Sequence, residues 1–166
     1  MVENQKLKDK KVRSTLELFW QTVPPVWHAA RSITHQTATE EFQITVSQFH
    51  TLRRIADGIG SVSDLADCMH LSRSNISRSV DELVNAGYVN REQDARDRRN
   101  INLTLTESGN NLIQSLLVSN ENKMMGKFNL LDDIELDDIA HGLIALQKVF
   151  GKKGRTLRNR WKNYLN

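Results

Sequence analysis

The sequence has little of what marks secreted, membrane or metal-binding proteins. Its 166 residues include one cysteine, Cys68, which excludes an internal disulfide and a zinc site built from several cysteines. The apolar runs are only a few residues long, too short to span a bilayer, and the charged N-terminal stretch lacks the apolar region of a signal peptide. We therefore expect a cytoplasmic protein with no membrane partner.

Patterns for catalysis and cofactor binding are also absent. There is no glycine-rich phosphate loop and no nucleophile with a matching His and Asp. The five histidines show no His-x-x-x-His or Glu-x-x-His spacing, so a zinc site is not supported. Cys68 has no close basic neighbour in sequence to activate it, and we interpret it as a structural or incidental thiol rather than as a redox switch. We predict no enzyme, no cofactor and no metal.

The net charge of +3 says little about a partner, but its distribution says more. Residues 147–166 hold seven basic residues and no acidic one, whereas residues 61–109 hold six arginines against eight acids. If residues 61–109 bind a polyanion such as a nucleic acid, the arginines and the acids must lie on different faces.

Hydrophobic periodicity predicts a helix over residues 12–23, a break or kink at Pro24-Pro25, and a second helical piece over residues 26–35. Residues 36–45 are polar and are predicted to form a connector. A further helix is predicted over residues 46–57.

The centre of the chain predicts two short helices joined by a tight turn and followed by a hairpin. Ser61 begins the first helix, and Ser72 caps the second, which Gly87 ends. Alternating residues predict strands over 88–93 and 100–106.

After the hairpin, Thr106 caps a long helix through about residue 131, and an acidic run from Asp132 opens a last helix.

The second short helix has one apolar and one polar side. Ile76, Val80 and Leu83 form the apolar side. The polar side, with its N-terminal cap, is the candidate recognition surface: Ser72, Arg73, Ser74, Asn75, Ser77 and Arg78. Arginine can form two hydrogen bonds to guanine and asparagine two to adenine, so we interpret this helix as one that reads the major groove.

The hairpin tip carries charge that suits a groove of DNA. We expect Asp97 to pair with Arg99, Arg99 to enter a minor groove, and Arg96 and Arg98 to lie beside phosphates. Arg91 at the strand start either contacts phosphate or anchors the hairpin to the helix.

The run from Val62 to Gly109 resembles the MarR family of winged-helix transcriptional regulators. The matching motifs are Leu65-Ala66, Leu71-Ser72, Val80-Asp81-x-Leu83, Gly87-Tyr88-Val89, Arg91, Asp97-x-Arg99 and Leu105-Thr106-x-x-Gly109. The resemblance implies a homodimer with intertwined terminal helices that binds a pseudo-palindromic operator of double-stranded DNA, usually to repress. It also implies that a small-molecule effector can lodge between the dimer helices and the winged helix.

Carried over residue by residue, the resemblance assigns the wing arginine to Arg99, its acidic partner to Asp97, and the recognition contacts to residues 72–78. Trp20, Trp27 and Phe49 either line an effector pocket or belong to the core or dimer interface. The basic tail, residues 148–162, lies along DNA, covers the dimer partner or is a solvated terminus.

We predict a mainly α protein of the α+β class: a winged helix-turn-helix flanked by long N- and C-terminal dimerisation helices. The expected regions are residues 1–45 for N-terminal dimerisation, 46–109 for DNA binding, and 110–166 for C-terminal dimerisation and the tail, all within one compact domain. Two alternatives remain open: a winged helix that binds proteins, and a DNA-binding regulator without a ligand.

Overall fold

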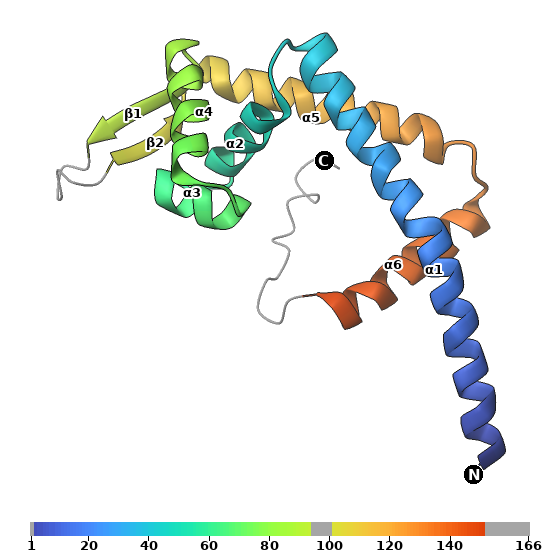
Figure 1. The fold of residues 1–166 in the computed structure, drawn as a ribbon. Helices are drawn as coiled ribbons and strands as arrows, with labels where there is room; N and C mark the ends of the chain where they lie inside the picture. Colours follow the sequence, from blue (N-terminus) through green and yellow to red (C-terminus); the bar gives the residue numbers. More distant parts are fainter. Residues whose placement is uncertain (1, 94–100, 152–166) are drawn as a thin grey trace. The chain divides into compact units, whose positions relative to one another are not determined.

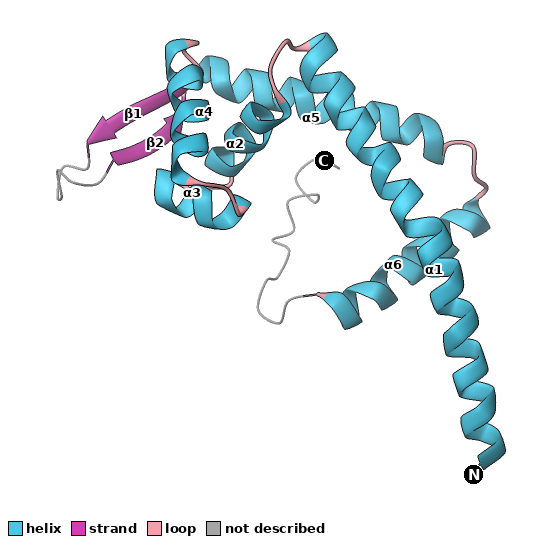
Figure 2. Ribbon diagram, in the orientation of Figure 1, coloured by secondary structure: helices cyan, strands magenta, loops and turns pink. Residues whose placement is uncertain are grey.

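The computed structural model describes residues 2–93 and 101–151. In chain order its elements are α1 (Val2–Gln36), the π-helical turn η1 (Thr37–Glu41), α2 (Val46–Ala56), α3 (Val62–Met69), α4 (Arg73–Asn85), β1 (Val89–Gln93), β2 (Ile101–Leu105), α5 (Glu107–Phe128) and α6 (Asp133–Phe150). Figure 1 follows this order by colour, and Figure 2 shows how strongly helix predominates over the one small sheet. The predicted mainly helical α+β fold is confirmed.

The chain divides into two compact units, residues 1–124 and 125–166. The first holds the elements from α1 to β2 and most of α5, and the second holds the end of α5 and α6. The regional boundaries at residues 45 and 109 remain predictions. Within the described residues, no helix is both long and apolar enough to cross a membrane.

Side-chain caps begin the helices where the local sequence predicts them. The Ser61 hydroxyl accepts the backbone N–H of Asp64 at 3.0 Å, and the Ser72 hydroxyl accepts that of Asn75 at 3.3 Å. Asp132 forms a capping box at the start of α6, whose acidic first turn complements the helix dipole. These caps satisfy backbone donors that no residue inside the helix can reach.

The first helix differs from its prediction. Pro24 and Pro25 lie inside α1, which is one helix of 35 residues, so the predicted division into two pieces is wrong. The two prolines remove the N–H groups that would bond to the carbonyls of Trp20 and Gln21. The turns on either side keep their own hydrogen bonds, and these carry the helix past the two missing bonds.

The predicted polar connector at residues 36–45 is also largely helical. Residues 37–41 form η1, in which Thr37 and Ala38 are fully buried. The backbone N–H of Ile44 bonds back to the Ala38 carbonyl at 2.9 Å, and Gln43 takes the left-handed conformation with φ of 54°. The segment is therefore packed into the fold, and π-helical turns of this kind are frequent at functional sites.

Strands β1 and β2 pair antiparallel, with Arg91 opposite Leu103, and the predicted hairpin is confirmed to within a residue at each end. Only Val89 and Leu103 of the two strands are buried. The Leu103 N–H donates to the Gly60 carbonyl at 2.8 Å, which fixes β2 to the segment before α3. Leu105 is partly buried against the core, and the other described residues of the two strands are exposed.

One hydrophobic core joins η1, α2, α3, α4, the sheet and α5. Its largest fully buried apolar side chains are Phe49, Leu52, Leu65, Ile76, Val80, Leu83, Ile113 and Leu116. The apolar stripe predicted for the second short helix is thus part of this core. Its burial leaves the opposite side of α4 free for other contacts.

The start of α5 lies unusually close to the turn after α4. The Thr106 hydroxyl donates to the Gly87 carbonyl at 2.7 Å and accepts the Gly109 N–H at 3.0 Å. A side-chain carbon at Gly109 would overlap the backbone carbonyl of Tyr88. Only glycine permits this approach, which explains physically why a Thr-x-x-Gly sequence follows the hairpin.

Candidate nucleic-acid interface

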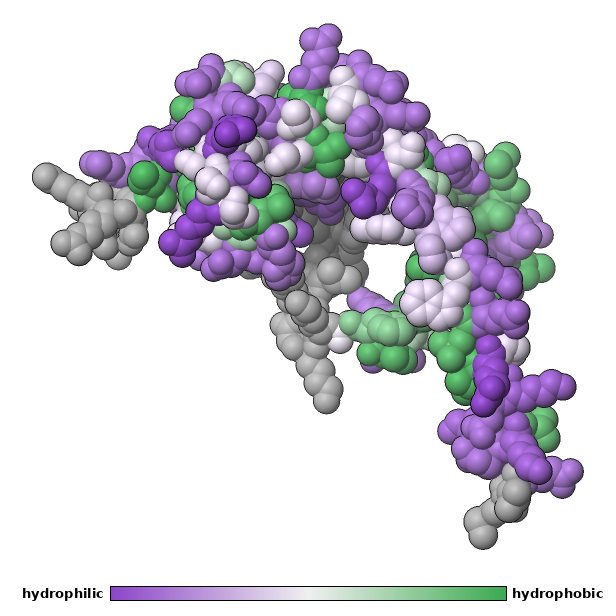
Figure 3. All heavy atoms as spheres, in the orientation of Figure 1, coloured by the Kyte–Doolittle hydropathy of each residue, from purple (hydrophilic) through white to green (hydrophobic). Residues whose placement is uncertain are grey.

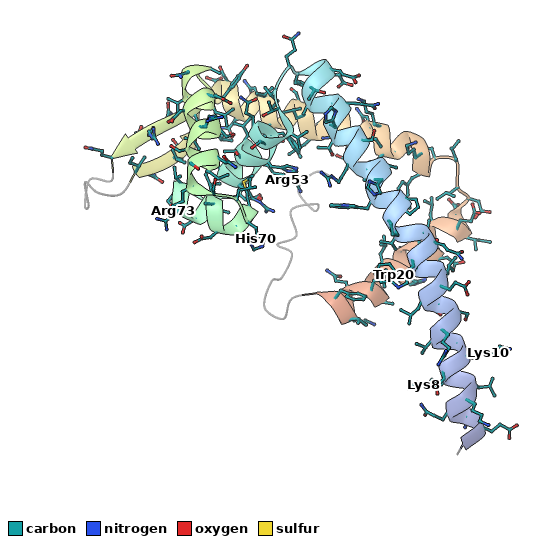
Figure 4. All side chains as sticks on the ribbon, in the orientation of Figure 1. Lys8, Lys10, Trp20, Arg53, His70 and Arg73 are labelled. Carbon is teal, nitrogen blue, oxygen red and sulfur yellow. The ribbon has the colours of Figure 1, made fainter. Side chains whose placement is uncertain are left out.

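The polar side of α4 is open as the sequence predicts. Arg73, Ser74, Asn75 and Arg78 are exposed and Ser77 is partly exposed. Arg73 projects from the first turn of the helix, away from its neighbours (Figure 4). Three arginine or asparagine side chains therefore lie within the first two turns, where a recognition helix meets base edges.

The cap of α4 shapes the beginning of this surface. The Ser72 hydroxyl lies 3.0 Å from the hydroxyl of Ser74 while it caps the helix. The exposed N-terminal turn therefore presents hydroxyls beside backbone N–H groups, an arrangement that favours an anion such as phosphate.

Charges are segregated along α4. Its first half carries Arg73 and Arg78, whereas its second half carries Asp81 and Glu82. Asp81 Oδ1 accepts a hydrogen bond from Arg91 Nη1 at 2.7 Å, and the Glu82 carboxylate accepts one from Gln48. Both acids are thus engaged within the protein, away from the first turn. The separation that DNA binding requires exists on this helix.

The ion pair between Arg91 and Asp81 connects β1 to α4. Of the two roles left open for Arg91, it supports the anchoring one. Asp81 is not among the site residues that the sequence predicts, although it stands in the Val80-Asp81-x-Leu83 motif. Its spacing from Arg91 gave no reason to pair the two.

The predicted wing contacts Arg96, Asp97, Arg98 and Arg99 lie outside the described residues. Most of the basic tail, from residue 152 onward, does as well. What the structure describes is the base of the wing, where β1 and β2 are paired and joined to α4.

The three aromatic residues predicted near an effector occupy different environments. Phe49 is 2% exposed and belongs to the core, whereas Trp20 and Trp27 on α1 are 68% and 62% exposed. The Trp20 ring meets Phe19 edge-on, with centroids 5.3 Å apart. Within the described residues, neither tryptophan belongs to the core cluster that holds Phe49.

Cys68 is a free, partly buried thiol in α3. Among residues 2–93 and 101–151, no group of three or more histidines, cysteines or acids is arranged to hold a metal ion. His70, which follows α3, takes the left-handed conformation with φ of 54° and forms the turn into α4.

A charged cluster that the sequence analysis missed fastens η1 to α5. Lys123 Nζ lies 2.5 Å from Glu41 Oε1 and donates to the Thr37 hydroxyl at 3.1 Å, while the Ser119 hydroxyl donates to Glu41 Oε2 at 2.6 Å. The hydrogen bonds from Lys123 and then Ser119 hold the pKa of Glu41 below its ordinary value. These partners are about 80 residues apart in the chain, so no local pattern reveals them.

His50 in α2 lies in a cationic environment. Burial lowers the pKa of its imidazole, and the charges of Arg53, Arg54 and Arg31 lower it further. Arg31 belongs to α1, so positive charge from two helices gathers at His50. Arg54 is partly balanced by Asp57, at 3.6 Å.

Residues 42–100 match the sequence model of the MarR family. The relative YfiV of Bacillus subtilis, an uncharacterised helix-turn-helix transcriptional regulator, is 31% identical over 55% of this chain and 57% of its own length. BadR of Rhodopseudomonas palustris, a transcriptional activatory protein, is 29% identical over 73% of this chain and 72% of its own length. The chain therefore spans little more than half of YfiV.

Solved structures share the fold. A variant of Staphylococcus aureus MepR bound to an oligodeoxyribonucleotide superposes with a TM-score of 0.62 and 21% identity, over 79% of this chain and 96% of MepR. The hairpin after α4, the close approach of α5 at Gly109 and the matched residues 42–100 agree with the motifs that the sequence shows. Over residues 42–100 the chain matches the MarR family of winged-helix transcriptional regulators, and the chain shares its fold with MepR.

Proposed function

We propose that this protein binds double-stranded DNA in a sequence-dependent way, with α4 in the major groove and the wing beside it. The observation that carries the proposal is that α4 is buried on one side and exposed on the other. Ile76, Val80 and Leu83 fix one side in the core, and Arg73, Asn75 and Arg78 stand exposed on the other. MarR-family proteins are DNA-binding regulators and not enzymes, which excludes catalysis as the main activity.

Alanine substitutions in α4 test this proposal. Genomic fragments selected by the purified protein supply the operator, and fluorescence anisotropy then measures affinity for it. Arg73→Ala or Asn75→Ala is expected to weaken operator binding by about 5- to 150-fold, corresponding to about 1–3 kcal/mol for a lost base contact.

Arg13→Ala is the matched control, because Arg13 is an exposed arginine on α1. Operator affinity that survives both α4 substitutions, or that falls equally with the control, would contradict the assignment of the recognition helix.

The wing belongs to the same proposal. Arg99, with Asp97 beside it, is proposed to enter the minor groove, and Arg96 and Arg98 to contact phosphates. The support is the family motif and the described base of the wing, held to α4 by Arg91. We expect Arg99→Ala to weaken binding and to reduce the dependence of affinity on salt, since a cation near phosphates is lost. An unchanged salt dependence would count against this role.

We further propose that the protein acts as a homodimer. All of α6 lacks a buried residue although it is rich in leucine, isoleucine and valine, and on α1 Leu16, Trp20 and Trp27 are at least half exposed. Figure 3 shows green, hydrophobic side chains at the surface in the region of these helices. A second copy that covers these faces would also supply the second α4 that a pseudo-palindromic operator requires. Sedimentation velocity tests this by the mass of the particle.

The proposed outcome of binding is repression, because a dimer lying across a promoter excludes polymerase. A reporter gene behind the selected operator measures the sign: repression predicts higher expression when the protein is deleted. Lower expression would assign activation, the role that the name of BadR gives to that relative.

Release by a small-molecule effector is a separate proposal. The exposed Trp20 and Trp27 offer a direct readout, since a ligand bound near α1 would change their fluorescence. A compound that changes this fluorescence and weakens operator binding in the same concentration range would support it.

A protein-binding winged helix is the competing function, favoured by the excess of acids over arginines in residues 61–109. Two of these acids, Asp81 and Glu82, are already engaged by Arg91 and Gln48. Failure to bind any selected DNA from low to moderate salt would favour this alternative.

A further inference from the structure

Two polar contacts connect α2 to the recognition helix. Gln48 Nε2 donates to Glu82 Oε2 at 3.0 Å, and the hydroxyls of Thr51 and Ser79 share a hydrogen bond at 3.3 Å. Gln48 and Thr51 lie one turn apart on α2, and Ser79 and Glu82 lie one turn apart on α4, in the opposite order. We name these four residues the α2–α4 polar seam.

Gln48 is held from both sides. Its Oε1 accepts the backbone N–H of Thr45 at 2.7 Å, and its own backbone N–H donates to the Thr45 hydroxyl at 3.1 Å, which forms the capping box of α2. The amide oxygen is thereby committed to the cap, so the amide nitrogen, a donor only, faces the Glu82 carboxylate. The Gln48 side chain therefore caps the start of α2 and also hydrogen-bonds to Glu82 of α4.

The second contact is buried. Thr51 is fully buried and Ser79 is 5% exposed, and the surroundings of both are the apolar core. Apolar contacts tolerate a small slide or rotation of one helix on another, whereas two buried hydroxyls that lose each other are left unsatisfied. The pair therefore favours one register of α4 against α2.

We infer that the polar seam sets the axial position and rotation of α4, and that Gln48 is a positioning residue for DNA reading that acts through Glu82. This inference rests on the proposed DNA binding. Arg73, Asn75 and Arg78 all project from the helix that the seam holds, so a shift of α4 moves their backbone positions together. A misplacement of about 1 Å is enough to spoil paired hydrogen bonds to a base, whose useful range of distance is narrower than that.

The negative charge of Glu82 determines which substitution at Gln48 tests the inference. Gln48→Glu keeps the capping box, since glutamate is a favoured residue at this position, but it places one carboxylate against another. We expect operator affinity to fall by about fivefold or more, within the usual range of coupling between sites. Urea unfolding of the same variant verifies that it is folded under the binding conditions.

The double variant Gln48→Glu/Glu82→Gln reverses the polarity of the hydrogen bond, because the new amide on α4 can donate to the new carboxylate on α2. We expect affinity to return to within about twofold of the unchanged protein. Glu82→Gln alone leaves two amides that can still bond, and its affinity is expected to stay within about twofold as well. If added negative charge near DNA were the whole cause, the two substitutions would have independent effects, and Glu82→Gln alone would strengthen binding.

A second pair of substitutions separates positioning from stability. Thr51→Val/Ser79→Ala replaces both buried hydroxyls by apolar groups of similar shape, a change that is often neutral for stability. We expect weaker operator binding at an unaltered urea midpoint. Unchanged affinity in this variant and in Gln48→Glu would overturn the inference while the unchanged protein still binds its operator. Absence of binding by the unchanged protein would overturn the proposed function, and this inference with it.

Discussion

Two parts of the molecule treat their apolar side chains in opposite ways. Between α2 and β2, residues such as Phe49, Leu65 and Ile76 are at most 2% exposed. In α1 and α6, Trp20 and Leu143 are 68% and 59% exposed, and α6 buries no residue at all. One chain is enough to bury the apolar side chains around α4, whereas it leaves the apolar side chains of α1 and α6 largely exposed.

This difference separates two requirements of operator binding. The presentation of Arg73 and Asn75 depends on the core behind α4, which a single chain builds. The distance between two copies of α4 depends on whatever covers α1 and α6, proposed here to be a second copy. An effector that favours one distance over another would act on the second requirement and leave the first intact.

Disrupting the proposed dimer interface on α1 and α6 is expected to have the largest effect on dimerisation and on operator binding. Leu143→Glu places a charge in the proposed interface and should weaken dimerisation by roughly 2–4 kcal/mol, as substitutions at the centre of interfaces do. Sedimentation equilibrium measures this. Operator affinity should fall in parallel, while α2 to β2 remains folded.

His141→Glu introduces the same side chain on the opposite face of α6 and is expected to change dimerisation by no more than about 0.5 kcal/mol. A variant Leu143→Glu that remains fully dimeric would show that α6 is covered by something other than a second copy.

The next largest effect is expected at Gly109, where the start of α5 packs against the backbone of Tyr88, just before β1. Gly109→Ala puts a methyl group onto the carbonyl of Tyr88, and because that atom belongs to the backbone, α5 must shift. We expect a loss of about 2–3 kcal/mol in the free energy of unfolding, as for other overpacked sites.

The same substitution at Gly142 of α6 meets nothing within 4 Å in the chain. Gly142→Ala should raise helix stability by about 0.5–1 kcal/mol. Urea titration measures the free energy of unfolding of both variants. Equal changes in Gly109→Ala and Gly142→Ala would contradict the predicted difference between the two sites.

The contrast also explains what the sequence could predict. Ser61, Ser72 and Thr106 cap helices through partners three residues away, so their roles follow from local chemistry alone. The same is true of the hairpin and of the buried stripe on α4. The seam from Gln48 to Glu82 and the cluster of Glu41 with Lys123 join residues far apart in the chain, and periodicity carries no information about them.

The two errors, at the prolines of α1 and in the predicted connector, share one cause. Pro24-Pro25 and the polar residues 36–45 were interpreted by their local preferences. In the fold, intact turns continue α1 past the prolines, and burial of Thr37 and Ala38 turns the connector into η1. In the connector, tertiary contacts outweigh local preference, whereas at the prolines the neighbouring turns of the same helix do.

Replacing a histidine by glycine is expected to have a smaller effect on stability. The effect should have opposite signs at His70, after α3, and at His141, inside α6. His70 has φ of 54°, a conformation that costs glycine less than other residues, so His70→Gly should stabilise the protein by about 0.5–1 kcal/mol. His141→Gly, inside α6, should destabilise it by about 1 kcal/mol, the usual penalty for glycine within a helix. Thermal unfolding distinguishes them, and destabilisation by both would show that His70 makes contacts worth more than its strain.

The smallest expected effect concerns the cluster between η1 and α5, which follows α1 in the chain and precedes α2. The pKa of Glu41 lies below its ordinary value of 4.5, chiefly because Lys123 and Ser119 donate hydrogen bonds to the carboxylate. The charged form is therefore favoured in the folded state, so Glu41 contributes stability fully above about pH 4.5 and loses it as the pH falls through the lower folded pKa.

Glu41→Gln should thus be less stable than the unchanged protein near neutral pH, and the gap should narrow as the pH drops below 4.5. Glu40→Gln removes the same charge from the neighbouring exposed residue and controls for net charge. Urea midpoints measured across this pH range give the difference in stability between Glu41→Gln and the protein with Glu41. A difference that does not change with pH would mean that the hydrogen bonds from Lys123 and Ser119 do not depend on the ionisation of Glu41. A narrowing gap would place a titratable contact at η1, which in the chain lies between α1, with its exposed apolar side chains, and α2, which belongs to the core.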